Sequence, residues 1–143
     1  MACFADVNVM LAIMHERHAF SVSAHQWLST QREAGSVAIC RVVQMALLRL
    51  STRPSVMKDD VISAKDFWEG WGVLTRDDRF SLVDEPTGFE KTWRGLCAAI
   101  PHGQCAETDV YLAAFAMARG DTLVTFDTGF SRFDSLQSKV LRP

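Results

Sequence analysis

Apolar runs alternate along the chain with stretches in which apolar residues recur at helical spacing, and this alternation predicts strands and helices in turn. Four short runs rich in β-branched or aromatic residues, at 3–9, 37–40, 80–85 and 122–126, predict buried strands, the first ending at or just past Asp6. A short terminal strand is expected at 139–141. Strands alternating with helices predict an α/β fold with a mostly parallel sheet of four to five strands.

Three of the expected helices lie in the first half of the chain. The first begins at Asn8, and the second follows Ser21 and is ended by Gly35. The third spans residues 42–52 and stops before Pro54, because the residue before a proline is disfavoured in a helix. It is apolar almost all round, so we expect it to be buried.

The later helices are predicted from their capping signals. Asp60 is expected to cap a helix that carries several aromatic residues. A Thr-x-x-Glu pattern at 87–90 is a capping box for a helix that runs to Ile100. Thr108 is expected to cap a helix that Gly120 closes.

Length and composition restrict the class of protein. With 143 residues, 48% of them hydrophobic, the chain predicts a single domain over 1–143 with a sizeable core. No apolar run is long enough to span a membrane, and the apolar N-terminus lacks the basic start of a secretion signal. The four cysteines show no C-x-x-C pair, so we expect reduced thiols in a cytoplasmic protein.

Charge excludes one kind of partner. The net charge is −2 and no long run of either sign occurs. A protein that binds long duplex DNA normally carries a basic stripe, so its absence argues against that role but not against a short RNA substrate. The four histidines show no metal-ligand spacing.

Three aspartates fall where an open parallel sheet binds ligands, beyond the carboxyl ends of its strands. Asp6 ends the first strand, Asp127 directly follows the fourth, and Asp109 lies in the first turn of the helix before it. Each alone is explained as well by helix capping, although a charge within an apolar strand, as at Asp6, is costly. Three carboxylates at one edge repel each other unless a cation neutralises them. Such oxygen ligands favour Mg²⁺ or Mn²⁺ and phosphodiester hydrolysis.

Two other chemistries on an α/β fold fail on their own residues. A phosphotransfer site of the dehalogenase type needs a second aspartate two residues after the first, where this chain has Asn8. A receiver site needs a lysine after a late strand, and none lies between Lys91 and Lys139. Nucleotide-binding folds are excluded because the chain lacks both glycine-rich phosphate motifs.

At these residues the sequence resembles the PIN-domain family. ADVNV with a helix after it is similar to the D-x-N opening of PIN domains, and CRVVQMALLRLST resembles their second motif. TDVYLAAFAMARGDTLVTFD resembles the third and fourth motifs and is the most specific part. The likeness spans Asp6 to Asp127 and extends to VapC toxins of toxin–antitoxin pairs, which are similar in length.

The resemblance implies a three-layer α/β/α sandwich, RNA cleavage that depends on Mg²⁺ or Mn²⁺, frequent homodimerisation, and inhibition by a cognate VapB-like antitoxin. Carried over by position, Asp6, Asp109 and Asp127 are the acidic metal-site residues. Asn8 and Thr108 are then polar supports that orient those carboxylates through hydrogen bonds.

One position departs from the family pattern. The helix after the second strand usually carries a glutamate in this family, and the matching residue here is Gln44. An amide can ligate through its carbonyl oxygen or hydrogen-bond a metal-bound water, but it adds no negative charge, so we expect weaker binding of a second cation. A structural role, in which Gln44 only satisfies a neighbouring polar group, stays open. Glu107, two residues before Asp109, is a candidate for supplying part of the missing charge, and a solvent-exposed role for it stays open.

The resemblance and the departure at Gln44 leave two functions open. The first is a toxin endoribonuclease, a hydrolase whose catalytic set is Asp6, Gln44, Asp109 and Asp127. The alternative is a catalytically weak PIN-like domain that binds RNA or a partner protein without cleaving. Arg41 and Arg49 flank Gln44. Arg49 is a candidate to neutralise RNA phosphate or to pair with an acidic residue across a dimer interface, and a solvated or structural role stays open for both. The apolar helices early in the chain are candidates for an antitoxin groove.

Overall fold

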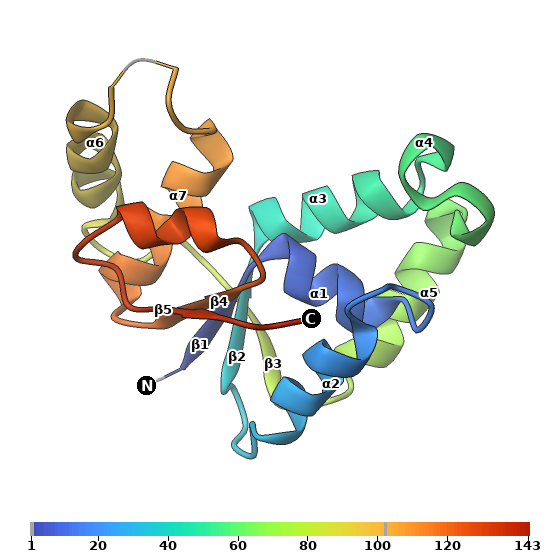
Figure 1. The fold of residues 1–143 in the computed structure, drawn as a ribbon. Helices are drawn as coiled ribbons and strands as arrows, with labels where there is room; N and C mark the ends of the chain where they lie inside the picture. The colour runs from blue at the N-terminus through green and yellow to red at the C-terminus, as the bar shows by residue number, and fades with distance from the viewer. Residues whose placement is uncertain (1, 102) are drawn as a thin grey trace.

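The computed structural model describes residues 2–101 and 103–143, and Met1 and His102 lie outside it. Over the described residues, five strands form one parallel sheet in the order β3-β2-β1-β4-β5 (Figure 1). The strands are β1 Cys3–Ala5, β2 Val37–Cys40, β3 Phe80–Val83, β4 Thr122–Thr125 and β5 Ser138–Val140. The predicted α/β fold with a parallel sheet is therefore confirmed. Strand β2 has the predicted bounds, and β1, β3 and β4 end earlier than expected.

Helices connect all of the strands except the last two, which a 3₁₀ helix joins. In the described part of the chain the α-helices are α1 Val7–Met14, α2 Ser21–Ser29, α3 Arg41–Ser51, α4 Pro54–Met57, α5 Ala64–Leu74, α6 Phe89–Ala99 and α7 Glu107–Arg119. Two 3₁₀ helices, η1 Lys58–Asp60 and η2 Thr128–Arg132, complete the set. Within residues 2–101 and 103–143, no helix has both the length and the apolar character needed to cross a membrane.

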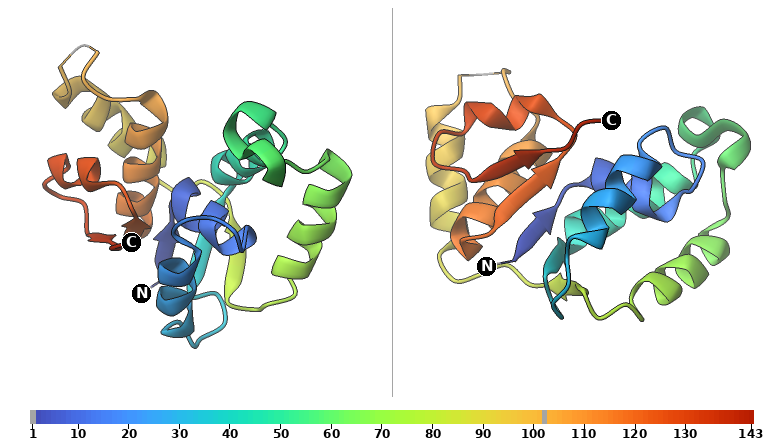
Figure 2. Two further views of the ribbon diagram at one scale, coloured as in Figure 1. Left: turned by 45° about the vertical axis from the view of Figure 1, so that its right-hand side comes forward. Right: turned by 60° about the horizontal axis from the view of Figure 1, so that its bottom comes forward.

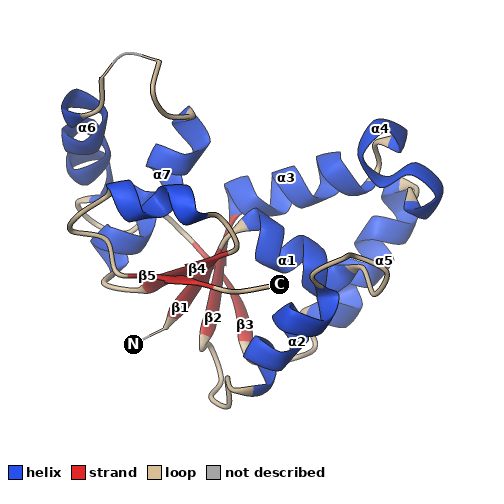
Figure 3. Cartoon of the chain, viewed as in Figure 1, coloured by secondary structure: helices blue, strands red, loops and turns tan. Residues whose placement is uncertain are grey.

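The sheet lies between two helical layers (Figures 2 and 3). Helices α1, α2, α3 and α5 cover one face, and α6 and α7 cover the other. The chain moves from β1 through β2 to β3 in one direction, and then crosses to build β4 and β5 on the other side of β1. The winding therefore reverses between β1 and β4, and ligands of open α/β sheets bind at such a reversal.

The core is continuous across both faces of the sheet, which explains why β1 and β2 are apolar on every residue and why Leu123 and Val124 of β4 are fully buried. Phe4 of β1 is fully buried, and its ring stacks on Phe115 of α7 with centroids 4.9 Å apart. On the other face, Val9 and Met10 of α1 are fully buried. Burying a side chain of this size contributes about 1.5–3 kcal/mol, so α1 and α7 are both held firmly to β1.

The segment between α3 and α5 differs from the prediction. Asp60 does not cap a helix, because it lies within η1. Ser63 caps α5 instead, and its Oγ accepts a hydrogen bond from the backbone N–H of Asp66 at 3.0 Å. Helix α3 ends at Ser51, before Pro54 as predicted, and Pro54 is the first residue of the short helix α4, a position where its missing N–H costs nothing.

Three other boundary signals were also misassigned. Gly88, with φ 82°, precedes α6, and Glu90 pairs with Arg94 at 3.2 Å instead of completing a capping box. Thr108 lies inside the first turn of α7, which begins at Glu107 without a side-chain cap. Helix α2 already ends at Ser29, so Gly35 belongs to the loop before β2. Gly120 closes α7 with φ 74°, as predicted.

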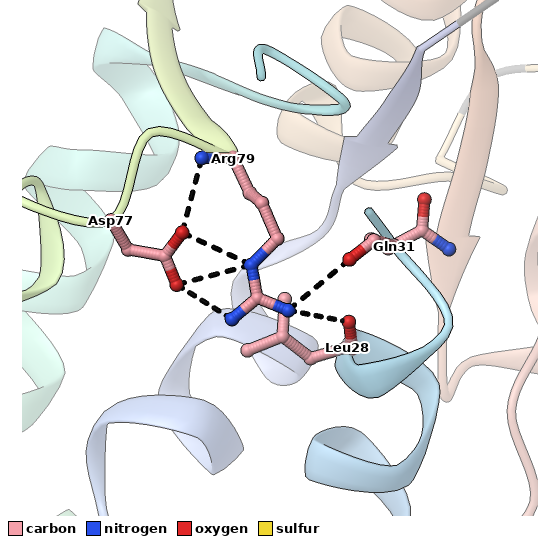
Figure 4. Close-up of polar contacts among 4 residues, drawn as sticks. All are labelled: Leu28, Gln31, Asp77 and Arg79. Atoms are coloured by element: carbon pink, nitrogen blue, oxygen red, sulfur yellow. Dashed lines mark hydrogen bonds and ion pairs between the residues drawn. The ribbon is translucent and has the colours of Figure 1, made fainter. Parts of the chain in front are cut away.

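Arg79 ties the start of β3 to the end of α2 (Figure 4). Its guanidinium pairs with the Asp77 carboxylate, with Nη2 to Oδ2 at 2.6 Å. Nη1 donates to the carbonyl oxygens of Leu28 at 2.9 Å and Gln31 at 3.2 Å. Leu28 lies in the last turn of α2 and Gln31 lies two residues beyond the helix, so one side chain both contacts the C-terminal end of α2 and holds the loop before β3.

Replacing Arg79 with Met is expected to lower the free energy of unfolding by about 2 kcal/mol at pH 7, because several charge-assisted hydrogen bonds are lost. The pKa of Asp77 lies below its usual value because Arg79 donates to it. The pair therefore stabilises the fold above the unfolded pKa of about 3.9, and that contribution is lost as pH falls through the folded pKa. Urea unfolding at pH 7 and pH 3 measures both effects.

The control for this change is Arg94→Met, which removes an exposed pair on α6. Exposed pairs of this kind contribute little, so the loss is expected to stay below about 0.5 kcal/mol. Equal losses for the two variants would show that Arg79 has no special role.

Candidate active site

The ends of β1 and β4 meet at the point where the winding of the sheet reverses. Asp6 directly follows β1, and Asp127 lies two residues after β4. Because β1 and β4 pair in parallel, with Ala5 opposite Val124, the two carboxylates leave the sheet at the same edge. The backbone N–H of Asp6 also donates to the carbonyl of Val124 at 3.0 Å, so the two strand ends are joined by a hydrogen bond.

Asp6 is a buried residue, with 6% of its surface exposed. Its Oδ1 accepts from the backbone N–H of Val7 at 2.7 Å and caps α1, which begins one residue earlier than expected. Its Oδ2 accepts from the Thr125 hydroxyl at 2.6 Å. The pKa of Asp6 is nevertheless raised, chiefly by burial, and also by the charges of Asp109 and Asp127, which outweigh the two hydrogen bonds.

The hydroxyl of Thr125, fully buried at the end of β4, connects several parts of the site. While donating to Asp6, its Oγ1 accepts from the backbone N–H of Asp127 at 2.9 Å and from Asn8 Nδ2 at 3.3 Å. Asn8 makes a second contact directly after β4, where its Oδ1 accepts from the backbone N–H of Phe126 at 3.2 Å. The hydroxyl thus fixes the position of the Asp6 carboxylate, directly after β1, relative to the backbone of Asp127.

The Asp127 carboxylate is oriented by the helix that follows it. Its Oδ1 accepts from the backbone N–H of Gly129 at 2.7 Å and so caps η2. A Cβ at residue 129 would approach that oxygen to 3.0 Å, so the absence of a side chain there allows the carboxylate to lie over the start of η2. The side chain of Asp127 remains exposed to solvent.

Asp109 lies in the first turn of α7, close enough to Asp127 and Arg132 to interact with their charges. Its pKa is raised by partial burial and by the Asp127 carboxylate, whereas the Arg132 guanidinium acts in the opposite sense. Arg132 is held by the carbonyls of Gly129 at 2.8 Å and Gln104 at 2.7 Å. The structure therefore brings Asp6, Asp109 and Asp127 within electrostatic reach of each other and places one cation beside them.

The three carboxylates do not form a closed metal cage. Among residues 2–101 and 103–143, no three His, Cys, Asp or Glu side chains are close enough to hold one metal ion together. Burial and neighbouring carboxylates raise the pKa of both Asp6 and Asp109, so each is harder to ionise than a free carboxyl group. A positive charge placed between them would favour the ionised forms.

Gln44 is a buried residue of α3. Its side chain forms a hydrogen bond to Arg41 and, within the described residues, none to the three aspartates. Its Oε1 accepts from Arg41 Nη1 at 2.5 Å. Because a guanidinium offers donors only, this bond requires the amide to present its oxygen to Arg41 and its NH₂ group elsewhere. The carbonyl oxygen that would be the metal ligand is therefore already engaged.

Glu107 and Thr108 occupy the first turn of α7 and are both exposed. Neither makes a side-chain hydrogen bond to the three aspartates within the described residues. The structure thus places them near the start of the helix that carries Asp109, without a contact that orients its carboxylate.

Thr125 and Arg132 are the residues that sequence reasoning missed. Thr125 stands inside an apolar strand, two residues before Asp127, and a polar residue so close to the strand end was the available signal. Arg132 carries no such signal, because it reaches the site only through the turn of η2.

Comparison with known sequences identifies relatives over nearly the whole chain. The PIN domain family matches residues 3–136. The protein named Ribonuclease VapC41 of Mycobacterium tuberculosis is 31% identical over 140 residues, which cover 95% of this chain and 96% of that protein. Ribonuclease VapC38 of the same organism is 27% identical over 132 residues, covering 87% of this chain and 84% of that protein.

Solved structures share the fold at lower identity. Mycobacterium tuberculosis VapC20, described as a Sarcin-Ricin loop cleaving toxin, superposes with a TM-score of 0.69 at 13% identity, covering 92% of this chain and 94% of that chain. VapBC2 from Rickettsia felis, bound to a DNA fragment from its promoter, gives 0.68 at 16% identity, covering 99% of this chain and 100% of the matched chain. These likenesses show that the chain shares the fold of those structures.

Replacing Thr125 with Val is expected to raise the pKa of Asp6 further, because the hydroxyl that stabilises the ionised carboxylate is lost. It also leaves Asp127 N–H without its acceptor, so the free energy of unfolding should fall by about 1–3 kcal/mol. Because the folded pKa of Asp6 is raised, stability declines as pH rises from about 3.9 through that pKa, and the decline extends to higher pH in the variant.

Carboxyl ¹³C NMR titration in EDTA measures the pKa, and urea unfolding measures stability. Thr125→Ser is the matched control, since it keeps the hydroxyl and should keep the pKa of Asp6. An unchanged Asp6 pKa in the Val variant would contradict the role given to the hydroxyl.

Proposed function

The chain belongs to the PIN domain family, and from that premise we propose that it is a Mg²⁺- or Mn²⁺-dependent endoribonuclease, the toxin of a toxin–antitoxin pair. The observation that carries the proposal is the buried Asp6 carboxylate, fixed by Thr125 and facing the charges of Asp109 and Asp127. Relatives named Ribonuclease VapC41 and VapC38 support the same activity.

The donors present fit a hard divalent ion that keeps part of its water shell. Mg²⁺ commonly binds one or two carboxylates, several waters and substrate phosphate, so three direct protein ligands are not needed. Asp6, Asp109 and Asp127 are the residues proposed to hold it. When bound, such an ion lowers the pKa of the attacking water and offsets charge on the scissile phosphate.

The residues of the chain then have separate tasks. Thr125 holds Asp6 in one orientation, and Gly129 N–H does the same for Asp127. Arg132 offsets part of the negative charge that an RNA phosphate meets beside Asp109. Gln44 is proposed to act through its NH₂ group, as a donor to a phosphate oxygen, because Arg41 occupies its carbonyl oxygen.

Replacing Asp6 with Asn should abolish RNA cleavage in Mg²⁺ or Mn²⁺. The expected loss exceeds about a hundredfold, because changing even the residues that support metal ligands reaches that size. Cleavage of single-stranded RNA by purified protein, with and without EDTA, measures it. Isothermal titration with Mn²⁺ should show weaker metal binding in the same variant.

Asp59→Asn, in the exposed helix η1, makes the same charge change away from the site and should cleave normally. If the wild-type protein cleaves no RNA in either metal and its expression arrests no growth, the chain is instead the catalytically weak PIN-like domain.

An antitoxin is proposed to bind between α1 and α5. A shallow apolar groove of about 300 Å³ lies there, lined by Ile13, Met14, Gly70, Val73 and Leu74. Val73 is 62% exposed, and Gly70 leaves open space on the same helix. An amphipathic helix binds such a groove with its apolar face, and VapBC complexes among the solved structures support a partner of the VapB type. Homodimerisation stays a prediction from the resemblance.

Replacing Val73 with Asp should weaken antitoxin binding by at least about tenfold, because a charge would be buried against an apolar helix. Surface plasmon resonance with the cognate VapB-like antitoxin measures the affinity. Val22→Asp on α2, a site 72% exposed, is the matched control and should bind normally. Equal affinity for both variants would place the antitoxin elsewhere.

A further inference from the structure

A polar hollow of about 350 Å³ lies beside the acidic site, at the same edge of the sheet. It is lined by residues from the start of α3, the end of β3 and the loop after it, and α7: Arg41, Val83, Asp84, Glu85, Tyr111 and Phe115. Two elements connect it to the site. Helix α3 begins directly after β2, the neighbour of β1, and α7 carries both Tyr111 and Asp109.

The hollow offers hydrogen-bond donors and acceptors that are not paired with each other. Arg41 is exposed and gives one N–H to Gln44, which leaves further guanidinium donors. Asp84 and Glu85 are exposed carboxylates, and within the described residues neither forms an ion pair with Arg41. A ligand that presents both donors and acceptors would therefore meet a partner for each.

Tyr111 fixes the position of one of these carboxylates. Its hydroxyl donates to Glu85 Oε1 at 2.8 Å. Its ring is held edge to face by Phe89 and Trp93, with centroids 4.9 and 5.4 Å away. A phenolic hydroxyl is protonated at neutral pH, so it is able to donate this bond. Glu85 is thus held in place and still has acceptor capacity on both oxygens.

We propose that this hollow binds one base of the RNA next to the scissile bond and selects guanine. The inference rests on the proposed function, because it places the hollow beside a cleavage site. Proteins read single-stranded RNA by hydrogen bonds to the edges of splayed bases. Guanine alone offers two adjacent donors, N1–H and N2–H, which match a carboxylate, while O6 and N7 accept from an arginine.

In this arrangement the Glu85 carboxylate accepts from N1–H and N2–H, and Arg41 donates to the acceptor edge. Uracil offers one donor, and adenine and cytosine present a single amino group, so each leaves part of the hollow unpaired. The acidic lining also makes the hollow unfavourable for a second phosphate, which favours a base over the backbone.

The test uses a set of short single-stranded RNAs in which each base around a mapped cut is varied in turn. The wild-type protein should cleave RNAs with guanine at one flanking position at least about tenfold faster than those with any other base there. Glu85→Gln should remove that preference, since its amide replaces an acceptor with a donor, while RNAs lacking the guanine are cleaved as by the wild type. Tyr111→Phe should reduce the preference less, because the carboxylate remains.

Glu90→Gln is the matched control, a glutamate paired with Arg94 on the outer side of α6, and it should keep the full preference. Fluorescence anisotropy of labelled RNAs in EDTA gives a second readout that needs no cleavage. Guanine-dependent binding that is lost in Glu85→Gln supports the inference even if no RNA is cleaved, and in that case the proposed function fails alone. Cleavage with no base preference, with a preference for another base, or with one unchanged in Glu85→Gln would overturn it.

Discussion

A single buried hydroxyl holds the acidic edge of this protein together. Thr125 donates to Asp6 from the end of β4 and accepts from the backbone of Asp127, so the two strands at the reversal of the sheet present their carboxylates in a fixed relation. Without such a donor, a carboxylate as buried as Asp6 would be still harder to ionise. Two helices also start at this edge, because Asp6 caps α1 and Asp127 caps η2.

Much of the fold could be predicted because the apolar pattern is strong. The inner strands are buried on both faces and therefore appear as short continuous apolar runs, and α3 and α7 carry long apolar stretches. Helix starts were harder, because Ser, Thr and Asp residues stand near most of them and local geometry selects one. Ser63 was chosen over Asp60, and α6 and α7 begin without any side-chain cap. The tie between Arg79 and α2 links residues about fifty positions apart, which no local pattern reveals.

The candidate site was predictable in its carboxylates and not in their supports. Asp6, Asp109 and Asp127 stand at strand ends or a helix start, where sequence position alone suggests a shared edge. The bonds of Thr125 and the reach of Arg132 depend on strand pairing and on the turn of η2. Gln44 shows the same limit: its position was expected, but its commitment to Arg41 follows from side-chain geometry. That bond leaves the NH₂ group as the part of the amide that Arg41 does not engage.

The parallel pairing of β1 with β4 also bears on when the protein becomes active during its synthesis. The hydrogen bond between Thr125 and Asp6 joins residues 119 positions apart, so the carboxylates cannot be assembled until β4 has left the ribosome and docked beside β1. At about 5–20 residues per second, the N-terminal half is exposed for several seconds without a complete acidic edge. The residues that line the groove between α1 and α5 are therefore synthesised before β4, and a partner already present in the cell would meet them before the acidic edge is complete.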